Sequence, residues 1–231
     1  MAILITGGAR SGKSSFAEQL AMRSASSGIY IATSRVWDRE MEDRIGKHKQ
    51  DREASGFPWE TVEEPMELTS LLKQLSALQQ LKIARGERAS VVLVDCLTLW
   101  LSNQLLELEE DIGADSDLDA DADGDGQAVD RFKYAKEASL GNDQQAMRQV
   151  ERIIHELVED IRSYPYPLIL VTNEVGSGVV PAYALGRKFR DAAGQLNQRA
   201  ASVCKQVFLV TAGIPVDMKR LAFQWEDWEG C

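Results

Sequence analysis

The sequence predicts an α/β fold with a mostly parallel central sheet and flanking helices. Short apolar runs rich in Val, Ile and Leu recur along the 231 residues, as in strands that are buried on both faces of a parallel sheet. Segments with helical spacing of apolar residues separate these runs. The first run leads directly into a glycine-rich loop and then a helical segment. Nothing in the length demands two domains, so we expect a single domain over residues 1–231.

Five strands and five helices are predicted in alternation. The expected strands are Ala2–Thr6, Ile29–Thr33, Val91–Asp95, Leu168–Thr172 and Val207–Thr211. The expected helices are Ser15–Ser26, Met66–Ala84, Thr98–Glu109, Gln144–Ser163 and Ala182–Cys204. This alternation predicts layers of helix and sheet that are joined by right-handed crossovers.

The loop after the first strand matches the P-loop pattern of nucleoside triphosphate sites. It reads Gly7-Gly8-Ala9-Arg10-Ser11-Gly12-Lys13-Ser14. Glycines let backbone N–H groups wrap around a polyphosphate, and the next helix N-terminus adds partial positive charge. Lys13 would reach the β and γ phosphates, and Ser14 would ligate Mg²⁺. A glycine-rich turn with a chance Lys-Ser pair is the alternative.

An acidic residue, Asp95, ends the third predicted strand. Downstream of a P-loop, this is where a carboxylate that organises Mg²⁺ is expected. The alternative is an N-cap for the helix that begins near Thr98. The fourth strand runs into the polar, glycine-containing stretch from Thr172 to Pro181, which falls at the same edge of the sheet and where a substrate could bind.

The two histidines differ in their surroundings. His155 lies within a helical run, so we expect it at a helix surface or core edge without a catalytic role. His48 follows the second strand, in a segment expected near the phosphates, and has lysines on both sides. A neutral imidazole is a competent nucleophile toward phosphorus, and basic neighbours would hold an anionic nucleotide and disfavour the imidazolium. A solvated surface histidine is the alternative for His48.

Composition argues against several classes of protein. No apolar run approaches the roughly 20 residues of a membrane span, and no signal-peptide pattern precedes the first strand, so we expect a cytoplasmic location without an integral membrane segment. The cysteines Cys96, Cys204 and Cys231 are widely separated, which indicates neither a disulfide framework nor a CxxC metal site. We expect no nucleic-acid partner, although the net charge of −10 argues against one only weakly.

The negative charge is concentrated in one segment. Eleven acidic residues and no Lys or Arg lie between Glu107 and Asp130, and without them the net charge of −10 becomes +1. We expect a disordered, solvated insert at about 111–126. The alternative is a calcium site, because Asp119, Asp121, Asp123, Gly124, Asp125 and Asp130 fall at positions 1, 3, 5, 6, 7 and 12 of an EF-hand-like loop. Position 12 is then Asp rather than the usual Glu.

Together these motifs resemble the bifunctional adenosylcobinamide kinase / adenosylcobinamide-phosphate guanylyltransferase family of cobalamin biosynthesis. The similarity runs from Ile3 to about Ala201 in the segments ILITGGARSGKSSFAE, YIATS, EMEDRIGKHKQDR, WETVEEP, VVLVDCLTLWLSN and VTNEVGSGVVPAYALGRKFRDAAGQLNQRAA. The resemblance implies a RecA-like P-loop NTPase fold and two reactions. ATP or GTP phosphorylates the terminal hydroxyl of adenosylcobinamide, and GMP then passes from GTP through a histidine to the resulting phosphate.

The resemblance also implies roles for individual residues. His48 matches the histidine of the R-I-x-x-H pattern and becomes the nucleophile, while Lys13 serves the kinase step. The residues that fall where the family contacts the nucleotide are Gly7 to Ser14, Ala32, Thr33, Ser34, Lys49, Gln50, Asp51, Arg52, Glu63 and Asp95. Mg²⁺ would be held by Ser14 and Asp95. The sequence departs from the family pattern at two places. Lys205 stands at a position that is often acidic in relatives, and the acidic stretch is lengthened.

Adenosylcobinamide and adenosylcobinamide phosphate are the implied substrates, and ATP, GTP and Mg²⁺ the implied cofactors. We expect a homo-oligomer. Two rival functions use the same P-loop: a RecA-like ATPase that acts on a protein or nucleic-acid partner, and a nucleotide-binding regulatory module without turnover.

Overall fold

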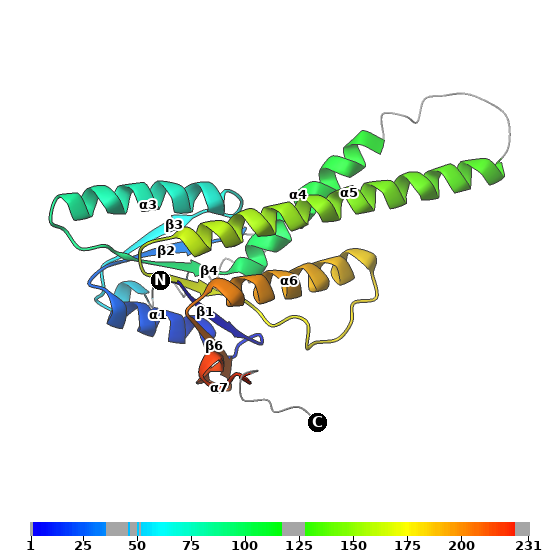
Figure 1. Ribbon diagram of the computed structural model, residues 1–231. Helices are drawn as coiled ribbons and strands as arrows, with labels where there is room; N and C mark the ends of the chain where they lie inside the picture. Colours follow the sequence, from blue (N-terminus) through cyan, green and yellow to red (C-terminus); the bar gives the residue numbers. More distant parts are fainter. Residues whose placement is uncertain (1, 36–45, 47–49, 51, 117–127, 225–231) are drawn as a thin grey trace.

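The computed structural model describes residues 2–35, 46, 50, 52–116 and 128–224, with the backbone alone at 109–116 and 128–143 (Figure 1). Its strands are β1 Ala2–Gly7, β2 Gly28–Ala32, β3 Trp59–Glu63, β4 Val91–Asp95, β5 Leu168–Val171, β6 Gln206–Thr211 and β7 Ile214–Asp217. Its helices are α1 Lys13–Ser24, α3 Leu68–Ala84, α4 Leu97–Ser116, α5 Ala128–Ser163, α6 Ala184–Val203 and α7 Met218–Leu221.

The strands form one seven-stranded sheet in the order β3-β2-β4-β5-β1-β6-β7. All neighbouring pairs are parallel except β6 and β7, which are antiparallel. The expected α/β, P-loop NTPase-like architecture with a mostly parallel sheet is therefore confirmed. Because β1, β2, β3, β4, β5 and β6 run in one direction, the loops that follow them open at one edge of the sheet.

Helices cover both faces of the sheet. On one face α3, α4, α5 and α6 enclose a core that includes Leu4, Val94 and Leu170 from the strands. On the other face α1 packs Ala17 and Ala21 against strand residues such as Leu93. Figure 1 shows α1 on the opposite side of the sheet from α3 and α5. Burial of each large aliphatic side chain contributes roughly 1.5–3 kcal/mol, so this double layer holds the carboxyl edge rigidly in place.

The long helix α5 packs against the core through one face of its second half. Val150, Ile154, Leu157 and Ile161 are spaced three or four residues apart and are buried. His155 lies between them in sequence but is exposed, because it points away from that stripe. The expectation that His155 is an ordinary helix-surface residue is confirmed.

Several predicted boundaries were wrong. Helix α5 begins at Ala128 rather than Gln144, and α4 continues to Ser116 rather than Glu109. Residues 111–116 of the expected insert are therefore helical, and residues 117–127 lie outside the described residues, so the disordered and calcium-binding alternatives stay open there. Figure 1 shows α4 and α5 extending together beyond the sheet.

Two strands were not predicted from the sequence, and both lie at edges of the sheet. The side chains of β3 are half-buried or exposed, and the strand contains Glu60 and Glu63 rather than a continuous apolar run. β7 has only four residues and contains Pro215. A strand with a single neighbour needs no continuous apolar sequence. Within the described part of the chain, no helix is both long and apolar enough to cross a membrane.

Candidate active site

The predicted site segments gather at the carboxyl edge of the sheet. Ala32 at the end of β2 lies in register with Asp95 at the end of β4 and with Glu63 at the end of β3. The P-loop begins at Gly7, the last residue of β1. Strand β5 separates β4 from β1, so the P-loop lies two strands from Asp95. At about 4.8 Å per strand, this places the ends of β1 and β4 about 10 Å apart.

The P-loop needs glycine at two of its positions. A side chain at Gly7 would overlap the carbonyl oxygen of Val210 on β6. Gly12 has a φ of 95° and serves as the N-cap of α1, where the backbone turns into the helix. At Gly8 the space that a Cβ would occupy is open, with no atom within 4 Å. The loop therefore has close backbone turns at Gly7 and Gly12 and open space beside Gly8, as a loop that binds a phosphate chain requires.

Lys13 lies over this loop. Its Nζ donates a hydrogen bond to the carbonyl oxygen of Gly8 at 2.9 Å, and the side chain is buried. The hydroxyl of Ser11 is also buried and has no hydrogen-bond partner among the described residues. An ammonium group and an unpaired hydroxyl within one glycine-rich loop fit a phosphate group, which accepts hydrogen bonds from both.

Asp95 is held by a tyrosine that the sequence did not single out. The hydroxyl of Tyr30 on β2 donates to Asp95 Oδ2 at 3.0 Å. Burial raises the pKa of Tyr30 well above its usual value, the Asp95 charge adds to this shift, and Arg52 acts in the opposite direction. Tyr30 therefore stays protonated and serves as a donor to the carboxylate. No sequence pattern places residues 30 and 95 together, because their pairing depends on the order of the strands.

Ser14 and Asp95 offer the hard oxygen ligands that Mg²⁺ prefers. Ser14 lies in the first turn of α1 and its hydroxyl has no protein partner within the described residues. Asp95 is half-buried, and Tyr30 engages only one of its two carboxylate oxygens. A hydroxyl and a carboxylate oxygen are thus available at the carboxyl edge. Their chemistry fits the expected metal.

The buried thiol of Cys96 lies near both Asp95 and Lys13. Its pKa is raised to about 12, mainly by burial and next by the Asp95 charge, while the Lys13 charge acts in the opposite direction. The charges of the P-loop lysine and of the β4 carboxylate thus act on this thiol in opposite directions.

Three of the predicted nucleotide contacts lie at the end of β2 and directly after it, and they differ in whether their side chains are available. Ala32 and Thr33 are buried, and Ser34 is half-exposed. The Thr33 hydroxyl donates to the Cys96 carbonyl at 2.7 Å and accepts from the Cys96 N–H at 2.8 Å. The Thr33 side chain is thus engaged in joining β2 to β4. Of these three predicted nucleotide contacts, Ser34 is the one with a side chain available for a ligand.

The segment around His48 is described only in part. His48, Lys49 and Asp51 lie outside the described residues. Gln50 is exposed, and Arg52 is buried with its guanidinium 3.7 Å from the centroid of the Tyr30 ring. Arg52 Nη1 also lies 3.6 Å from Glu18 Oε1 on α1. The structure therefore places Arg52 against α1 and β2, and a direct contact with nucleotide stays a prediction.

Glu63 lies far from the P-loop on the same edge. It is exposed and ends β3, four strands from β1. Four strand spacings are about 19 Å, so Glu63 and Lys13 cannot contact the same phosphate. If both residues contact one nucleotide, they hold opposite ends of it.

A polar network that sequence reasoning missed supports the end of β5. The Thr172 hydroxyl donates to Asn197 Oδ1 at 2.7 Å, and Asn197 Nδ2 donates to the Asn173 carbonyl at 2.9 Å. Thr98 accepts from the Asn173 N–H at 2.7 Å. The next residue, Glu174, donates its N–H to the Gly7 carbonyl at 3.1 Å. Through these bonds, helices α4 and α6 fix the turn after β5 against the P-loop.

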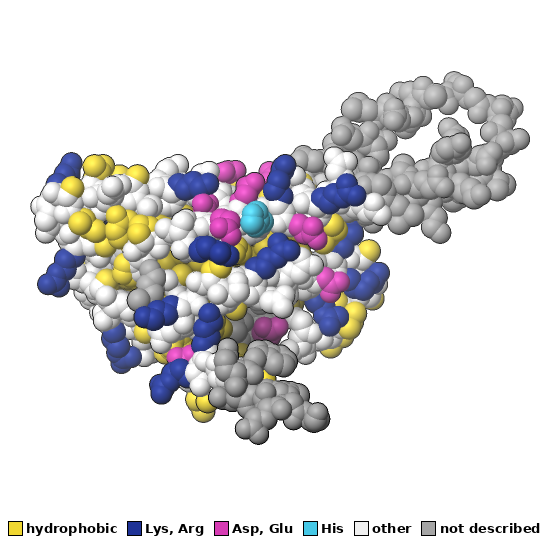
Figure 2. Space-filling view, viewed as in Figure 1, with side chains coloured by type: hydrophobic (Ala, Val, Ile, Leu, Met, Phe, Trp, Pro, Cys, Tyr) yellow, Lys and Arg dark blue, Asp and Glu magenta, His cyan; other side chains and the backbone are white. Residues whose placement is uncertain are grey.

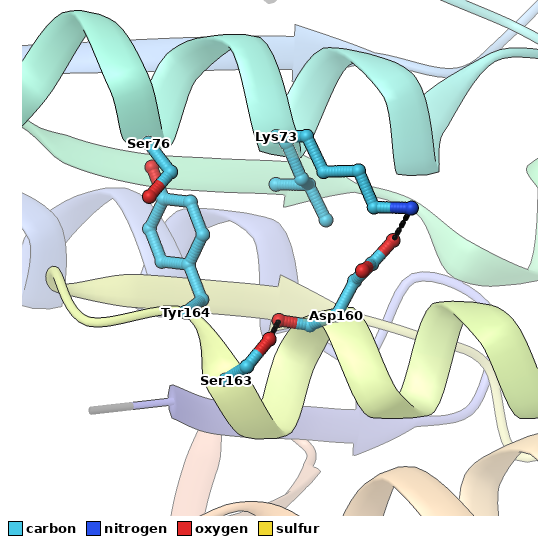
Figure 3. A pocket seen from close by; sticks show the side chains of 6 residues that line it. Lys73, Ser76, Asp160, Ser163 and Tyr164 are labelled. Atoms are coloured by element: carbon cyan, nitrogen blue, oxygen red, sulfur yellow. Dashed lines mark hydrogen bonds and ion pairs between the residues drawn. The ribbon is translucent and has the colours of Figure 1, made fainter.

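Two cavities lie away from this edge of the sheet. One of about 170 Å³ lies between α3 and α5, where Lys73 pairs with Asp160 at 3.3 Å beside Tyr164 (Figure 3). Another of about 260 Å³ is lined by α3 together with Ile29 of β2 and Glu60 of β3. Apolar side chains gather on the surface around α3 in Figure 2, and Leu78 and Leu81 there are 54% and 56% exposed. Neither cavity includes a residue of the predicted site.

The comparisons with known proteins agree with this arrangement. The sequence model of the family described as cobinamide kinase / cobinamide phosphate guanyltransferase, CobU, matches residues 3–218. The chain belongs to this family. It is similar to the bifunctional adenosylcobalamin biosynthesis protein CobU of Escherichia coli, with 38% identity over 220 residues that cover 95% of this chain and all of the relative.

Two further relatives extend the comparison. The bifunctional adenosylcobalamin biosynthesis protein CobP of Pseudomonas aeruginosa is 36% identical over 94% of this chain and 96% of its own length. CobU of Salmonella typhimurium is 36% identical over 95% of this chain and all of its own length. The match with this family thus covers the P-loop, the β4 carboxylate and the segment that carries His48.

Proposed function

We propose that the chain is the bifunctional enzyme that its family description names. It phosphorylates adenosylcobinamide with ATP or GTP, and it then transfers GMP from GTP to adenosylcobinamide phosphate to give adenosylcobinamide-GDP and pyrophosphate. The observation that carries this proposal is the P-loop with Lys13 and Asp95 at one sheet edge, in a chain whose family match covers residues 3–218. Both reactions need a triphosphate held at its phosphates, and this edge supplies the groups for it.

In the kinase reaction, the corrinoid hydroxyl oxygen attacks the γ-phosphorus. The bond from the γ-phosphorus to the oxygen that bridges it to the β-phosphate breaks, and the nucleoside diphosphate leaves. Lys13 and the N–H groups of the P-loop stabilise the charge that develops on the transferred phosphoryl group. The hydrogen bond from Lys13 to the Gly8 carbonyl does not prevent this, because an ammonium carries three N–H donors.

Mg²⁺, which Ser14 and Asp95 would hold, neutralises charge on the β and γ oxygens when it is bound. The contribution of the chain is to fix these two oxygen ligands. Ser14 is fixed by the first turn of α1, and Asp95 by the end of β4 and the Tyr30 hydroxyl.

In the guanylyl transfer, the His48 imidazole attacks the α-phosphorus of GTP. A P–N bond forms and pyrophosphate leaves. A phosphate oxygen of adenosylcobinamide phosphate then attacks the same phosphorus, the P–N bond breaks, and His48 is released. The covalent step lets one site accept two bulky substrates in turn.

The distance between Lys13 and Glu63 along the carboxyl edge of the sheet suggests how a nucleotide would lie. With its phosphates at Lys13 and its other end toward Ser34 and Glu63, it would run across the carboxyl ends of β5, β4 and β2. The α-phosphate would then lie between the P-loop and the segment that follows β2, where His48 occurs in the sequence. This orientation would put the γ-phosphorus beside Lys13.

We further propose a cytoplasmic homo-oligomer that needs no nucleic-acid partner. The net charge of −10 supports the last point only weakly, because eleven acidic residues lie in one segment and the rest of the chain sums to +1. Analytical ultracentrifugation at several protein concentrations tests the assembly. A RecA-like ATPase that acts on a macromolecular partner is the rival function, and no relative described above supports it.

Stepwise product analysis tests the function. With adenosylcobinamide and ATP alone, mass spectrometry should find adenosylcobinamide phosphate as the sole corrinoid product. Addition of GTP should then convert it to adenosylcobinamide-GDP with release of pyrophosphate. Nucleotide hydrolysis without any change in the corrinoid would favour the rival ATPase.

A further inference from the structure

Tyr30 contacts two charged residues from different parts of the site. Its hydroxyl donates to Asp95 Oδ2 at 3.0 Å, and its ring lies 3.7 Å from the guanidinium carbon of Arg52. Tyr30 is 6% exposed and Arg52 is 4% exposed, so water screens neither contact. One buried side chain therefore joins the carboxylate at the end of β4 to the residue four positions after His48.

The ring of Tyr30 is fixed from several sides. Arg52 stacks on its face, and Trp59 of the edge strand β3 packs edge-on with ring centroids 6.1 Å apart. Arg52 is itself positioned by Glu18, and its Nε and Nη1 have no hydrogen-bond partner in the described part of the chain. A desolvated guanidinium on an aromatic face is a strong form of this contact. The Tyr30 hydroxyl therefore has a fixed direction, and it points at Asp95.

The hydrogen bond leaves Asp95 with one oxygen for another ligand. Oδ2 accepts from Tyr30, and no protein donor to Oδ1 occurs among the described residues. A carboxylate that is held through one oxygen presents the other in a constant direction. Groups that orient metal ligands in this way typically change metal affinity by about 10- to 100-fold when they are removed.

We propose that Tyr30 is a positioning residue, which holds Asp95 in the orientation that binds nucleotide-bound Mg²⁺. It acts through Asp95 and does not itself touch the substrate. The proposal rests on the proposed function for the identity of the metal site, and it adds a residue to which no role had been given. Arg52, on this account, acts by fixing the Tyr30 ring.

The direct test is the affinity of the protein for Mn²⁺, used as the probe, in its complex with the non-hydrolysable ATP analogue AMP-PNP. Electron paramagnetic resonance measures free Mn²⁺ during titration of the full chain. Tyr30→Phe removes only the hydroxyl oxygen, so it should weaken Mn²⁺ binding by about 10- to 100-fold. Binding of AMP-PNP without metal should stay unchanged, because the P-loop holds the phosphates.

Tyr164→Phe is the matched control. Tyr164 is equally buried, at 6% exposure, and its hydroxyl accepts from Gln79, but it lies between the helices and away from the site. It should bind Mn²⁺ as the unmodified protein does. Equal Mn²⁺ affinity in Tyr30→Phe and the unmodified protein would overturn the proposal, and so would equal weakening in both variants.

A double-mutant cycle separates positioning from packing. If Tyr30 acts through Asp95, Tyr30→Phe should cause no further loss of Mn²⁺ affinity when Asp95 is already Asn. Additive losses would mean that Tyr30 acts by another route. Because these measurements need no corrinoid, they also separate the two proposals: absence of corrinoid turnover with a Tyr30 effect on Mn²⁺ would remove only the proposed function.

Discussion

The ammonium of Lys13 donates to the Gly8 carbonyl oxygen, 2.9 Å away within its own loop. The lysine that should meet the triphosphate therefore also makes a hydrogen bond within its own loop. Because an ammonium carries three N–H donors, this bond does not exclude another to a nucleotide phosphate, and a bond to the anionic phosphate is stronger than one to a neutral carbonyl.

Lys13→Ala should lower the rate of adenosylcobinamide phosphorylation by on the order of a hundredfold or more, because the charge on the β and γ phosphates is no longer neutralised. The rate is measured with ATP and adenosylcobinamide at saturating concentrations. Lys73→Ala is the control, since that exposed lysine pairs with Asp160 between α3 and α5. Near-normal kinase activity in folded Lys13→Ala protein would remove the P-loop from the mechanism.

Asn197→Leu should destabilise the protein, because the Asn173 carbonyl loses its partner and the Thr172 hydroxyl keeps only its hydrogen bond with the Thr98 hydroxyl. We expect a loss of roughly 1–3 kcal/mol in the free energy of unfolding, measured by urea denaturation. Gln198→Ala, at the exposed neighbouring position, should change it by no more than about 0.5 kcal/mol. Equal effects of the two substitutions would show that the network contributes nothing to stability.

Cys96 and Cys204 should resist alkylation in the folded protein. Burial raises the pKa of each thiol to about 12, so the reactive thiolate is scarce at pH 8, and both side chains are shielded. Iodoacetamide treatment followed by peptide mass spectrometry should show both unmodified in buffer and both modified in urea. Rapid modification of Cys96 in the native state would contradict the packing of β4 against α1.

The inner strands and the P-loop could be predicted from the sequence, but the contacts between distant residues could not. Val91–Asp95 was predicted to the residue because β4 is buried on both faces and its apolar run is uninterrupted. Trp59–Glu63 was missed because an edge strand can be half polar. Arg52 was expected at the nucleotide, but its contacts with Glu18 and Tyr30 join three elements whose proximity depends on strand order. No local pattern encodes such a relationship.

Replacement of residues 117–127 by a short Gly-Ser linker should leave both activities and the melting temperature nearly unchanged. These residues join the ends of α4 and α5, and a change in loop length costs little closure free energy. Activity and thermal unfolding are measured with and without calcium. A calcium-dependent rise in the melting temperature of the intact protein that the deletion abolishes would support the calcium site instead.

The central claim, that His48 carries GMP between the two substrates, is tested most directly by labelling with GTP that is radioactive at the α-phosphate. The unmodified protein and His155→Ala should both take up label as a phosphoramidate, which acid releases and alkali does not. His48→Ala should take up none, yet should still phosphorylate adenosylcobinamide, because that step needs no histidine nucleophile. Full labelling of His48→Ala, or an acid-stable adduct mapped to another residue, would contradict the account.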